Sequence, residues 1–436
     1  MNSAKSNTNL FVYLILIIFL YSCEKKNEID IPTVLFLKPY ENQHYVVGDT
    51  VPIIFDVTSI SNITAIQITL VNEALTPVSE NYQLNQLLGK TIGRVKFELI
   101  IDDLFMLSGN YFIKVLVKNK RETKYKYQKV SISNLDRKLL GVALISKQPN
   151  LINVWNYDLN YQKTLVKTMI GDYGGSKYLP FHNRMALSGK IKGSYTIWNY
   201  ITGDTVYHQN ALPNPPFPYF TGAASIDHYL VCQYYAGGFD LIDYKGNISN
   251  SINTTQDFYP VDIFDIGKNF ISIEYHIGST EKRLVAHVGS TGMNYSYNIL
   301  KGPVVKAFPF SENYFMMFSN YYGTGQIRKY YWNAGPTKPI SYSGDEFIDV
   351  AQIGVKDYLL LTANNVLWYQ YEKSSITSMI NISNLDVIKV LYESVSQTIW
   401  IVDKQGFSIY SYPSGNLISD HRVNEEVLNL HLIYNR

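Results

Sequence analysis

Metal binding and acid–base catalysis are the chemistries that the histidine and carboxylate side chains of this chain could support. Its 8 histidines are scattered, and none stands at the close spacing of a metal-ligand motif. The adjacent pairs Asp102-Asp103 and Glu425-Glu426 would point in different directions on a strand, so solvated turns are the better interpretation. Two carboxylates could still meet in space, but no motif marks them. The sequence therefore predicts neither a metal site nor a cofactor, and it leaves any catalytic residues unknown.

Aromatic side chains gather in some of the turn segments, where they could stack on sugars or form the hot spot of a protein interface. The candidate ligand-binding residues are Tyr173, Phe217, Tyr219, Tyr234, Tyr235, Phe258, Tyr259, Tyr275, His276, Tyr321 and Tyr322. Corresponding segments nearer the carboxyl end are plain, as in Ala363-Asn364-Asn365. The alternative is that a chain with 37 tyrosines carries the same bias in its loops. The sequence leaves both interpretations open.

The two cysteines call for different explanations. Cys232 lies in the apolar run Tyr229-Leu230-Val231-Cys232, where a free thiol behaves as a small buried hydrophobe. Cys23 follows an apolar run of signal-peptide length, Leu10 to Leu20, and directly precedes polar residues. The segment Leu20-Tyr21-Ser22-Cys23 resembles the lipobox of bacterial lipoproteins, in which the cysteine becomes the lipidated first residue.

This resemblance implies a lipoprotein signal peptide over residues 1–22 and a lipidated Cys23 with a linker over residues 23–31. Acyl chains contribute about 0.8 kcal/mol per buried methylene, so a lipidated cysteine holds a protein on a membrane without a spanning helix. The membrane is then the first expected partner. The expected location is the bacterial cell envelope, at the outer membrane, on a side that the sequence leaves open. A short transmembrane anchor is the alternative.

Composition limits the fold and the partners. Aromatic residues make up 14% and charged residues 17% of the 436 positions, and helical periodicity is almost absent, which favours strands. The 38 basic and 36 acidic residues leave a formal net charge of +2 with no basic stripe. Nucleic acid is therefore not an expected partner.

A repeated phrase organises the last 300 or so residues. Val154-Trp155-Asn156-Tyr157 is echoed by Ile197-Trp198-Asn199-Tyr200 and by Leu241-Ile242-Asp243-Tyr244, so that the tyrosines stand 43 and 44 residues apart. A period of about 40 to 45 residues is the length of one four-stranded propeller blade. The recurrent aromatic residue lies on the third strand of each unit, where we expect it to pack between adjacent blades.

The two ends of this region are expected to complete one blade. The first unit offers only three strands, and the strand that it lacks is available at the chain's end, over Val427 to Ile433. Closing the ring in this way removes exposed sheet edges. Residues 138–436 are thus predicted to form a seven-bladed β-propeller closed by the C-terminal strand, with six or eight blades as alternatives. The candidate aromatic residues then fall in the loops of units two to five on one face.

The turns Thr202-Gly203-Asp204 and Ser414-Gly415-Asn416 follow two of these aromatic strands. They resemble the turn of WD-repeat and quinoprotein-like propellers, in which glycine supplies the positive φ that the turn needs. The resemblance implies a fold and carries no chemistry.

Residues 32–134 are predicted to form a separate domain of six or seven short strands, an antiparallel β-sandwich. Val47-Gly48-Asp49-Thr50-Val51 and Ser108-Gly109-Asn110-Tyr111 resemble segments of immunoglobulin-like domains in Bacteroidota surface lipoproteins. This resemblance implies a spacer near the lipid anchor. The whole chain is then all-β, with an N-terminal immunoglobulin-like β-sandwich followed by the propeller.

The leading functional hypothesis is a membrane-anchored envelope lipoprotein that acts as a binding or scaffold module for a glycan or a protein partner. The alternative is a propeller-based carbohydrate-active enzyme, a glycoside hydrolase or a polysaccharide lyase, which would need carboxylates or a His/Tyr pair at the channel mouth. A structural subunit of an envelope complex is a third possibility.

Overall fold

The computed structural model describes residues 31–78, 83–86, 89–101, 103, 106–212, 217–267, 269–311, 313–332, 334–342, 344–382 and 386–435. Regular structure in these residues consists of strands and of two short 3-10 turns, Phe181–Asn183 and Gly289–Thr291, so the predicted all-β class is confirmed. The predicted signal peptide, Cys23 and nearly all of the linker lie outside the described residues. No helix in the described ranges is long and apolar enough to cross a membrane.

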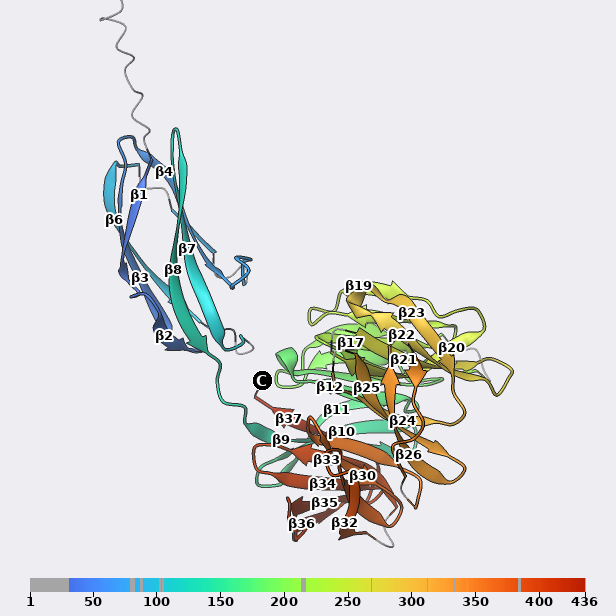
Figure 1. Cartoon of the computed structure of the whole chain (residues 1–436). Helices are drawn as coiled ribbons and strands as arrows, with labels where there is room; N and C mark the ends of the chain where they lie inside the picture. Colours follow the sequence, from blue (N-terminus) through green and yellow to red (C-terminus); the bar gives the residue numbers. More distant parts are fainter. Residues whose placement is uncertain are drawn as a thin grey trace, which may run out of the picture. The chain divides into compact units, whose positions relative to one another are not determined.

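The chain divides into two compact units between Leu135 and Asp136. The described strands of the first unit are β1 Thr33–Lys38, β2 Gln43–Val46, β3 Thr50–Thr58, β4 Ile63–Val71, β5 Gln83–Gln86, β6 Ile92–Ile100, β7 Gly109–Asn119 and β8 Thr123–Ser133. One sheet has the order β1-β3-β6 and the other the order β2-β8-β7-β4-β5 (Figure 1). Side chains alternate between buried and accessible along β3 and β7. The buried faces of both sheets meet in one core, which includes Phe55, Ile66 and Val115.

The second unit contains, in the part of the chain that the structure describes, seven sheets of four or five antiparallel strands. Sheet 1 combines β9, β10 and β11 with β37 from the end of the chain, and sheets 2 to 7 follow in sequence order. The first strands of sheets 1 to 7 are β37 Glu426–Tyr434, β12 Gly175–Leu179, β16 Phe220–Ile226, β20 Phe258–Ile266, β24 Val304–Pro309, β29 Asp349–Gly354 and β33 Val387–Glu393.

The remaining strands follow in the same order of sheets. The second strands are β9 Leu139–Gln148, β13 Arg184–Ser188, β17 Tyr229–Tyr234, β21 Asn269–His276, β25 Tyr314–Tyr321, β30 Asp357–Leu361 and β34 Thr398–Asp403. The third strands are β10 Leu151–Asp158, β14 Tyr195–Asn199, β18 Gly238–Ile242, β22 Lys282–Val288, β26 Thr324–Tyr331, β31 Asn365–Gln370 and β35 Gly406–Ser411. The outermost strands are β11 Lys163–Ile170, β15 Thr205–Gln209, β19 Ile248–Ile252, β23 Met293–Ile299, β27 Gly335–Pro336 with β28 Ser341–Tyr342, β32 Ser375–Asn381 and β36 Leu417–Arg422.

The first strands lie next to one another in the order of the sheets. β12 is beside β16, and each following first strand is beside the next as far as β33 and β37. β37 also lies beside β12, and it pairs antiparallel with β9, from Glu426 opposite Lys147 to Tyr434 opposite Leu139 (Figure 1). The seven described first strands therefore follow one another around a common axis, and the space that they surround is called the lumen below.

The recurrent aromatic residue, which lies at the end of β10 and just after β14 and β18, packs against the preceding sheet, as predicted. Tyr157 meets Phe407 of sheet 7 edge to face, with the ring centroids 5.8 Å apart. Tyr200 donates a hydrogen bond of 3.0 Å to Asn156 of sheet 1. The ring of Tyr244 stacks on His182 of sheet 2 at 3.9 Å. These contacts fill the spaces between sheets, so the phrase that fixes the repeat has a packing role.

Six of the first strands carry a β-bulge at which the pairing with the second strand slips; in β29 the slip falls near the end of the strand, between Gln352 and Gly354, and in the other five it falls within the first half. These five slips fall between Phe220 and Gly222, Pro260 and Asp262, Val304 and Lys306, Val387 and Lys389, and Val427 and Asn429. A bulge bends its strand and changes the direction of the side chain that follows. In four of the five strands that side chain is polar or charged, which places a functional group next to the lumen.

Candidate functional site

Charged residues on five first strands converge on the lumen, and we call them, with two residues of β37, the lumen cluster. Its members are Lys177, Asp262, Lys306, Asp349, Lys389, Asn429 and His431. The first five come from sheets 2, 4, 5, 6 and 7, and the last two lie on β37 of sheet 1. The charge of Lys306 contributes to lowering the pKa of Lys177, although their strands are not neighbours. The two ammonium groups are therefore close enough for their charges to interact.

Direct contacts join neighbouring members of the lumen cluster. Lys306 Nζ lies 3.2 Å from Asp349 Oδ1, and the Val390 backbone N–H donates to Asp349 Oδ2 at 3.1 Å. Lys389 Nζ donates to Asn429 Oδ1 at 2.7 Å and to the Leu430 carbonyl at 2.8 Å. These bonds connect β24 to β29, β29 to β33 and β33 to β37.

A second set of contacts continues the connection from β37 to β12. Asn429 Nδ2 donates to Ser176 Oγ at 3.1 Å, and Ser176 Oγ lies 2.9 Å from His431 Nε2. Tyr173 Oη, just before β12, lies 2.9 Å from Ser176 Oγ. Polar side chains thus join five consecutive first strands, which no backbone pairing links to one another.

Enclosure by protein shifts the titration of the lumen cluster. Burial, opposed by nearby carboxylates, lowers the pKa of Lys177 to about 8 and that of Lys389 to about 7. The Asp349 carboxylate is the main cause that raises the pKa of Lys306. Burial, reinforced by the three lysines, lowers the pKa of His431 well below its usual range, so this imidazole is neutral.

Asp262 is a solvent-accessible member of the lumen cluster. Its side chain is exposed to solvent, yet burial is the main cause that raises the pKa of this carboxyl to about 6. The carboxylate is therefore accessible to solvent although protein surrounds it on several sides. The raised pKa reflects the protein groups around the carboxyl, whereas its exposure follows from its accessible surface.

The structure brings four of the sequence-predicted aromatic residues into one continuous line, here called the aromatic ribbon. Phe217 stacks on Tyr235, with centroids 5.7 Å apart and planes 18° apart. The ring centroids of Tyr235 and Tyr259 are 4.5 Å apart, and those of Tyr259 and Tyr275 are 6.3 Å apart. Lys282 Nζ is 4.7 Å from the Tyr275 ring. Phe217 is exposed and the three tyrosines are half-buried, so sheets 3 and 4 present a row of accessible rings.

Tyr219 and Tyr234, also predicted, are held inside sheet 3. Their rings are 5.9 Å apart and both contact Phe220, which is fully buried. Tyr234 Oη lies 2.7 Å from Asp240 Oδ2, and burial raises the pKa of this phenol far above its usual range. These two residues therefore pack within sheet 3 and are not part of the ribbon.

The other predicted residues lie apart from the aromatic ribbon. Phe258 is buried and contacts His276 at 4.9 Å. Tyr321 and Tyr322 contact each other at 4.1 Å at the end of sheet 5, and Tyr322 is 87% exposed. Tyr173 belongs to the lumen cluster's surroundings, through Ser176. The predicted set therefore divides into one row of accessible rings and several separate contacts.

A buried ion pair lies behind Phe258 in sheet 4. Arg283 donates to Glu274 Oε2 through Nη2 at 2.6 Å and Nε at 2.9 Å, and Ser272 Oγ donates to Glu274 Oε1 at 2.8 Å. The guanidinium lies 3.6 Å from the Phe258 ring and forms part of a pocket of about 170 Å³. Ser272 Oγ is also 2.8 Å from His287 Nε2, but both residues are buried, which denies a substrate access to this pair.

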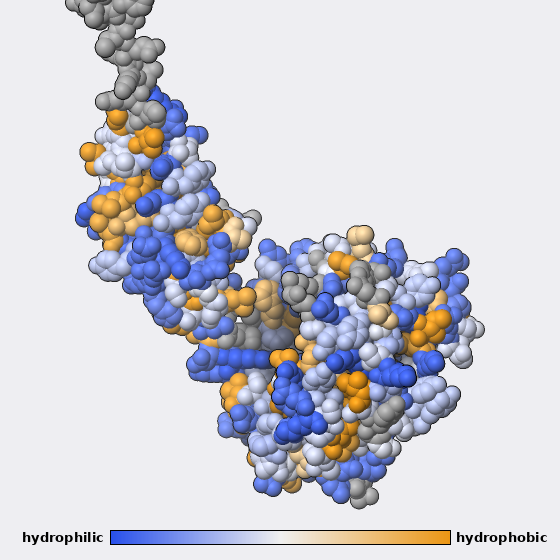
Figure 2. All heavy atoms as spheres, in the orientation of Figure 1, coloured by the Kyte–Doolittle hydropathy of each residue, from blue (hydrophilic) through white to orange (hydrophobic). Residues whose placement is uncertain are grey.

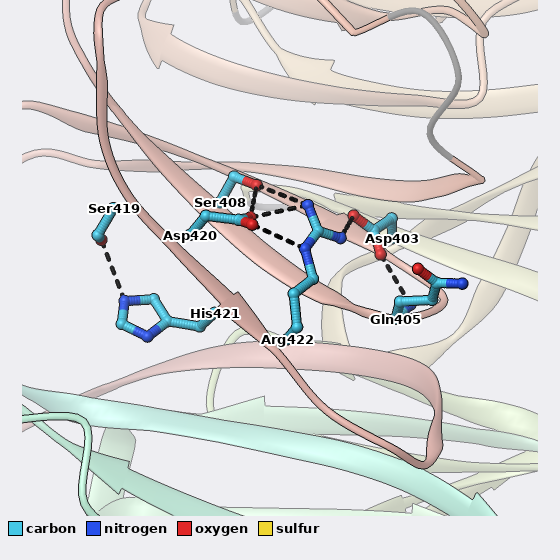
Figure 3. Close-up of polar contacts among 7 residues, drawn as sticks. All are labelled: Asp403, Gln405, Ser408, Ser419, Asp420, His421 and Arg422. Carbon is cyan, nitrogen blue, oxygen red and sulfur yellow. Dashed lines mark hydrogen bonds and ion pairs between the residues drawn. The ribbon is translucent and has the colours of Figure 1, made fainter.

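A second charged group, in sheet 7, shows how carboxylates are used for structure. Arg422 Nη1 lies 2.5 Å from Asp403 Oδ2, and Nε donates to Asp420 Oδ2 at 2.8 Å (Figure 3). Ser408 Oγ donates to Asp420 Oδ1, and the Gln405 N–H donates to Asp403 Oδ1. Every carboxylate oxygen has a donor, so this group holds β36 to the turn after β34.

Within the described residues, no three histidine, cysteine or acidic side chains are grouped so that they could hold a metal ion. On the visible face of the second unit, hydrophobic residues form only small separate groups among hydrophilic ones (Figure 2). A broad apolar interface is therefore not what this face offers.

No family of known proteins and no curated protein matches this sequence at a significant level. Among solved structures, the C-terminal WD40 domain of Sif2 is 10% identical, with a TM-score of 0.47 over 68% of this chain and 90% of that chain. BamB from Moraxella catarrhalis is 10% identical, with a TM-score of 0.43 over 68% and 95%. A quinoprotein alcohol dehydrogenase-like protein from Bacteroides thetaiotaomicron is 13% identical, with a TM-score of 0.42 over 92% and 99%. These neighbours are WD40 and quinoprotein-like β-propellers, the fold that the repeat predicted, and the likeness is one of fold alone.

The lumen cluster was not predicted from the sequence, although the sequence contains a signal for it. Asp262, Lys306, Asp349, Lys389 and Asn429 recur at intervals of 40 to 44 residues, close to the spacing of the aromatic repeat. Three of them end short segments of two apolar residues and one charged residue, such as Val304-Val305-Lys306. A search at the repeat period for charged residues in otherwise apolar strands would have found them.

Proposed function

We propose that the second unit is a seven-bladed β-propeller in which the seven sheets are the blades and β37 closes the ring. The order of the first strands around the axis supports this, since β37 lies beside both β33 and β12. We propose further that residues 32–134 form an immunoglobulin-like sandwich that serves as a spacer. Two sheets that share one apolar core support that assignment.

The proposed location of the protein rests on its amino-terminal sequence. Residues 1–22 are a lipoprotein signal peptide, Cys23 is lipidated, and residues 23–31 link the anchor to the spacer. The lipobox-like segment Leu20-Tyr21-Ser22-Cys23 supports this proposal. The protein is then an envelope lipoprotein held on the outer membrane through Cys23. Incorporation of labelled palmitate that is lost in Cys23→Ser would support the anchor, and incorporation unchanged by that substitution would refute it.

The proposed activity is binding of an extended glycan, and the aromatic ribbon is the observation that carries it. Four rings in a row, with successive centroids 4.5 to 6.3 Å apart, offer stacking platforms for several sugar rings. Tyrosine adds a hydroxyl beside each apolar face, and Lys282 adds an ammonium group at one end. A linear glycan uses such a row along its length.

The test is a glycan-binding screen with the chain carrying Cys23→Ser. We expect a polysaccharide ligand whose affinity falls about tenfold in Tyr235→Ala and in Tyr259→Ala, because each loses a stacking face worth roughly 1 kcal/mol or more. Tyr125→Ala, which removes an exposed tyrosine of the first unit, is the matched control. Capture of an envelope protein instead of a glycan, with loss in the same two variants, would replace the glycan by a protein partner. Unchanged binding in both variants would refute the ribbon as the site.

A further inference from the structure

Basic residues collect on the β7–β8 hairpin of the first unit. From Lys114 to Lys129 the chain has seven basic residues and one acidic residue, Glu122. The other residues of 32–134 include four basic and eight acidic ones. Five of the seven basic side chains are exposed, those of Lys118, Lys120, Arg121, Lys124 and Lys126. The formal net charge of the whole chain, +2, conceals this concentration of positive charge.

The basic side chains of the hairpin are not neutralised within the first unit. None of them forms an ion pair with a carboxylate of the described residues. Lysines on the free edge of a sheet also prevent pairing with other sheets, and β8 pairs with β2 only from Val130 onward. Lys118 lies on the inner strand β7, however, and Lys120 and Arg121 lie in the turn. Edge protection therefore does not account for the charges at the tip.

The tip of the hairpin lies at the end of the first unit where the described chain begins (Figure 1). Asn119 Nδ2 donates to Ser59 Oγ at 2.8 Å, and Thr58 pairs with Thr33 at the start of β1. This end of the unit is called the basic end below. Eight residues separate Cys23 from Ile31, a length of at most about 29 Å when fully extended. A membrane that holds Cys23 is thus within reach of the basic end.

Exposed isoleucine side chains occur at the basic end as well. The exposed fractions are 47% for Ile31, 67% for Ile60 and 67% for Ile92. Ile60 and Ile92 follow Ser59 and Thr91, which are joined by a backbone hydrogen bond of 2.8 Å from the Ser59 N–H. Basic and apolar side chains together suit the surface of a bilayer, where cations meet phosphates and apolar groups enter the headgroup layer.

Acidic residues lie at the opposite end of the first unit. Glu73 Oε1 accepts a hydrogen bond of 2.8 Å from Asn110, at the start of β7. Asp49 is two residues after Val47, whose N–H donates to the carbonyl of Ser133 at the end of β8. The 11 residues of β7 span about 36 Å between the two ends. The first unit is therefore electrically polarised along its length.

We propose that the basic end of the first unit lies on the anionic phosphate headgroups of a lipid bilayer. This inference rests on the lipid anchor proposed above, which brings the basic end to the membrane. A negatively charged surface attracts this end and repels the acidic end, so it orients the unit as well as holding it. The chain then leaves the first unit at Ser133, at the end away from the bilayer.

A lipid surface accounts for more of the observations than another polyanion does. An acidic polysaccharide would meet the same basic side chains, but it leaves the exposed Ile60 and Ile92 without a role. It also gives no reason for the hairpin tip to lie beside Thr58 and the start of the described chain. The bilayer is therefore the occupant that the combination of charge, apolar side chains and position favours.

The experiment is cosedimentation of residues 23–436, carrying Cys23→Ser, with vesicles. This chain contains both units but neither acyl chains nor the apolar run Leu10 to Leu20, which would itself bind lipid. We expect binding to vesicles of equal parts phosphatidylcholine and phosphatidylglycerol, at least tenfold weaker binding to phosphatidylcholine alone, and weaker binding as salt is added. Since no anchor is present, the outcome does not depend on lipidation of Cys23, which palmitate labelling tests separately.

Variants decide whether the basic end is responsible. The triple variant Lys120→Gln/Arg121→Gln/Lys124→Gln should weaken binding at least tenfold, because each basic side chain near the surface contributes about fivefold. The matched control, Lys301→Gln/Lys338→Gln/Lys373→Gln, removes three exposed lysines of the second unit and should bind like the parent chain. Ile60→Ser/Ile92→Ser should weaken binding and leave its salt dependence unchanged.

Three results would overturn the proposal. One is no binding to the vesicles with phosphatidylglycerol. Another is an equal loss in the two triple variants, which would show that only the net charge of the chain matters. The third is binding to the acidic polysaccharide heparin without binding to the vesicles, which would replace the bilayer by a soluble polyanion.

Discussion

The ammonium group of Lys306 lies 3.2 Å from a carboxylate oxygen of Asp349, on the first strand of the next sheet. The two strands belong to different sheets and share no ladder of backbone hydrogen bonds. Side chains must therefore connect the first strands where the sheets come closest. The contacts of Lys389 with β37 and of Ser176 with His431 have the same role, so the lumen cluster joins sheets as well as offering charge.

Replacing Lys306 by Met should destabilise the second unit by about 1–3 kcal/mol, because the nearly buried Asp349 carboxylate keeps only the Val390 N–H as a partner. Urea unfolding monitored by tryptophan fluorescence measures this. The control is Lys404→Met, whose ion pair with Asp386 is exposed and should contribute less than about 1 kcal/mol. Equal losses in the two variants would show that the Lys306–Asp349 contact does not join the sheets.

Lys389 should make the stability of the second unit rise with pH. Burial lowers its pKa to about 7, whereas an unfolded lysine titrates near 10.5. Between these values the unfolded chain binds a proton that the folded chain does not, so the free energy of unfolding increases with pH by at most about 1.4 kcal/mol per unit from this group. The penalty for burying the charged lysine is complete below pH 7 and is relieved as the pH rises.

The measurement is urea unfolding of wild type and Lys389→Met between pH 7 and 9.5, without small anions. The upper limit avoids ionisation of tyrosines in the unfolded chain, since burial raises the pKa of Tyr178 and Tyr434 in the folded protein. Wild type should show the steeper rise. Lys389→Met also leaves the Asn429 and Leu430 oxygens without a donor, which shifts all its values together but not their slope. Identical slopes would contradict the lowered pKa.

The sequence could predict the propeller-type repeat because packing between sheets demands the same large residue in each third strand. Tyr157, Tyr200 and Tyr244 fill equivalent spaces, so their period records the fold directly. The lumen places a weaker constraint on the type of residue at each position. Any residue that reaches solvent or a charged neighbour is tolerated there, and lysine, aspartate and asparagine alternate without a common type.

The β-bulges are a further reason why the lumen cluster could not be predicted from the sequence. A regular strand predicts that Val305 and Lys306 point to opposite faces of sheet 5, with no indication of a bend. The slip between Val304 and Lys306 depends on pairing with β25, which is not local in the sequence. The candidate aromatic residues were predicted to lie in loops, but Tyr234, Phe258, Tyr259, Tyr275, His276 and Tyr321 lie at the ends of strands. Only the orientation of each ring in the folded protein separates Tyr235 from the enclosed Tyr234.

Removing the buried guanidinium of Arg283 should cost about 3–5 kcal/mol of stability. Arg283→Met leaves Glu274, whose side chain is 1% exposed, with Ser272 as its main donor. The double variant Arg283→Met/Glu274→Leu removes both charges and should recover most of the loss, because two apolar side chains need no partner. Unfolding free energies of wild type, both single variants and the double variant form a cycle that checks this. A double variant as unstable as Arg283→Met would show that the loss comes from packing on Phe258.

The thiol of Cys232 should react with an aromatic disulfide reagent only when sheet 3 opens. Cys232 is fully buried, and burial raises the pKa of its thiol well above the usual range. With Cys23→Ser it is the single thiol of the chain. Labelling in native buffer at pH 8 should be at least about a thousandfold slower than in urea, since it requires local unfolding. Labelling within seconds in native buffer would place this strand at the surface.

Two turn glycines with similar backbone angles should differ in how they tolerate a side chain. Gly203 has a φ of 81° and Gly246 a φ of 90°, each after the third strand of its sheet. A Cβ on Gly203 meets nothing within 4 Å, whereas one on Gly246 would overlap the backbone oxygen of Val206 in the preceding sheet. Gly203→Ala should therefore cost about 1–2 kcal/mol from backbone strain alone.

Gly246→Ala should lose the same amount and a further 1–3 kcal/mol, roughly, from forcing β15 and the turn after β18 apart. Urea unfolding of the two variants gives the difference directly, and their shared positive φ makes Gly203→Ala the matched control. Because the obstructing atom is backbone, it cannot move aside as the end of a flexible side chain would. Equal destabilisation would mean that sheets 2 and 3 are not in contact at this turn, and that their packing rests on Tyr244 and His182 instead.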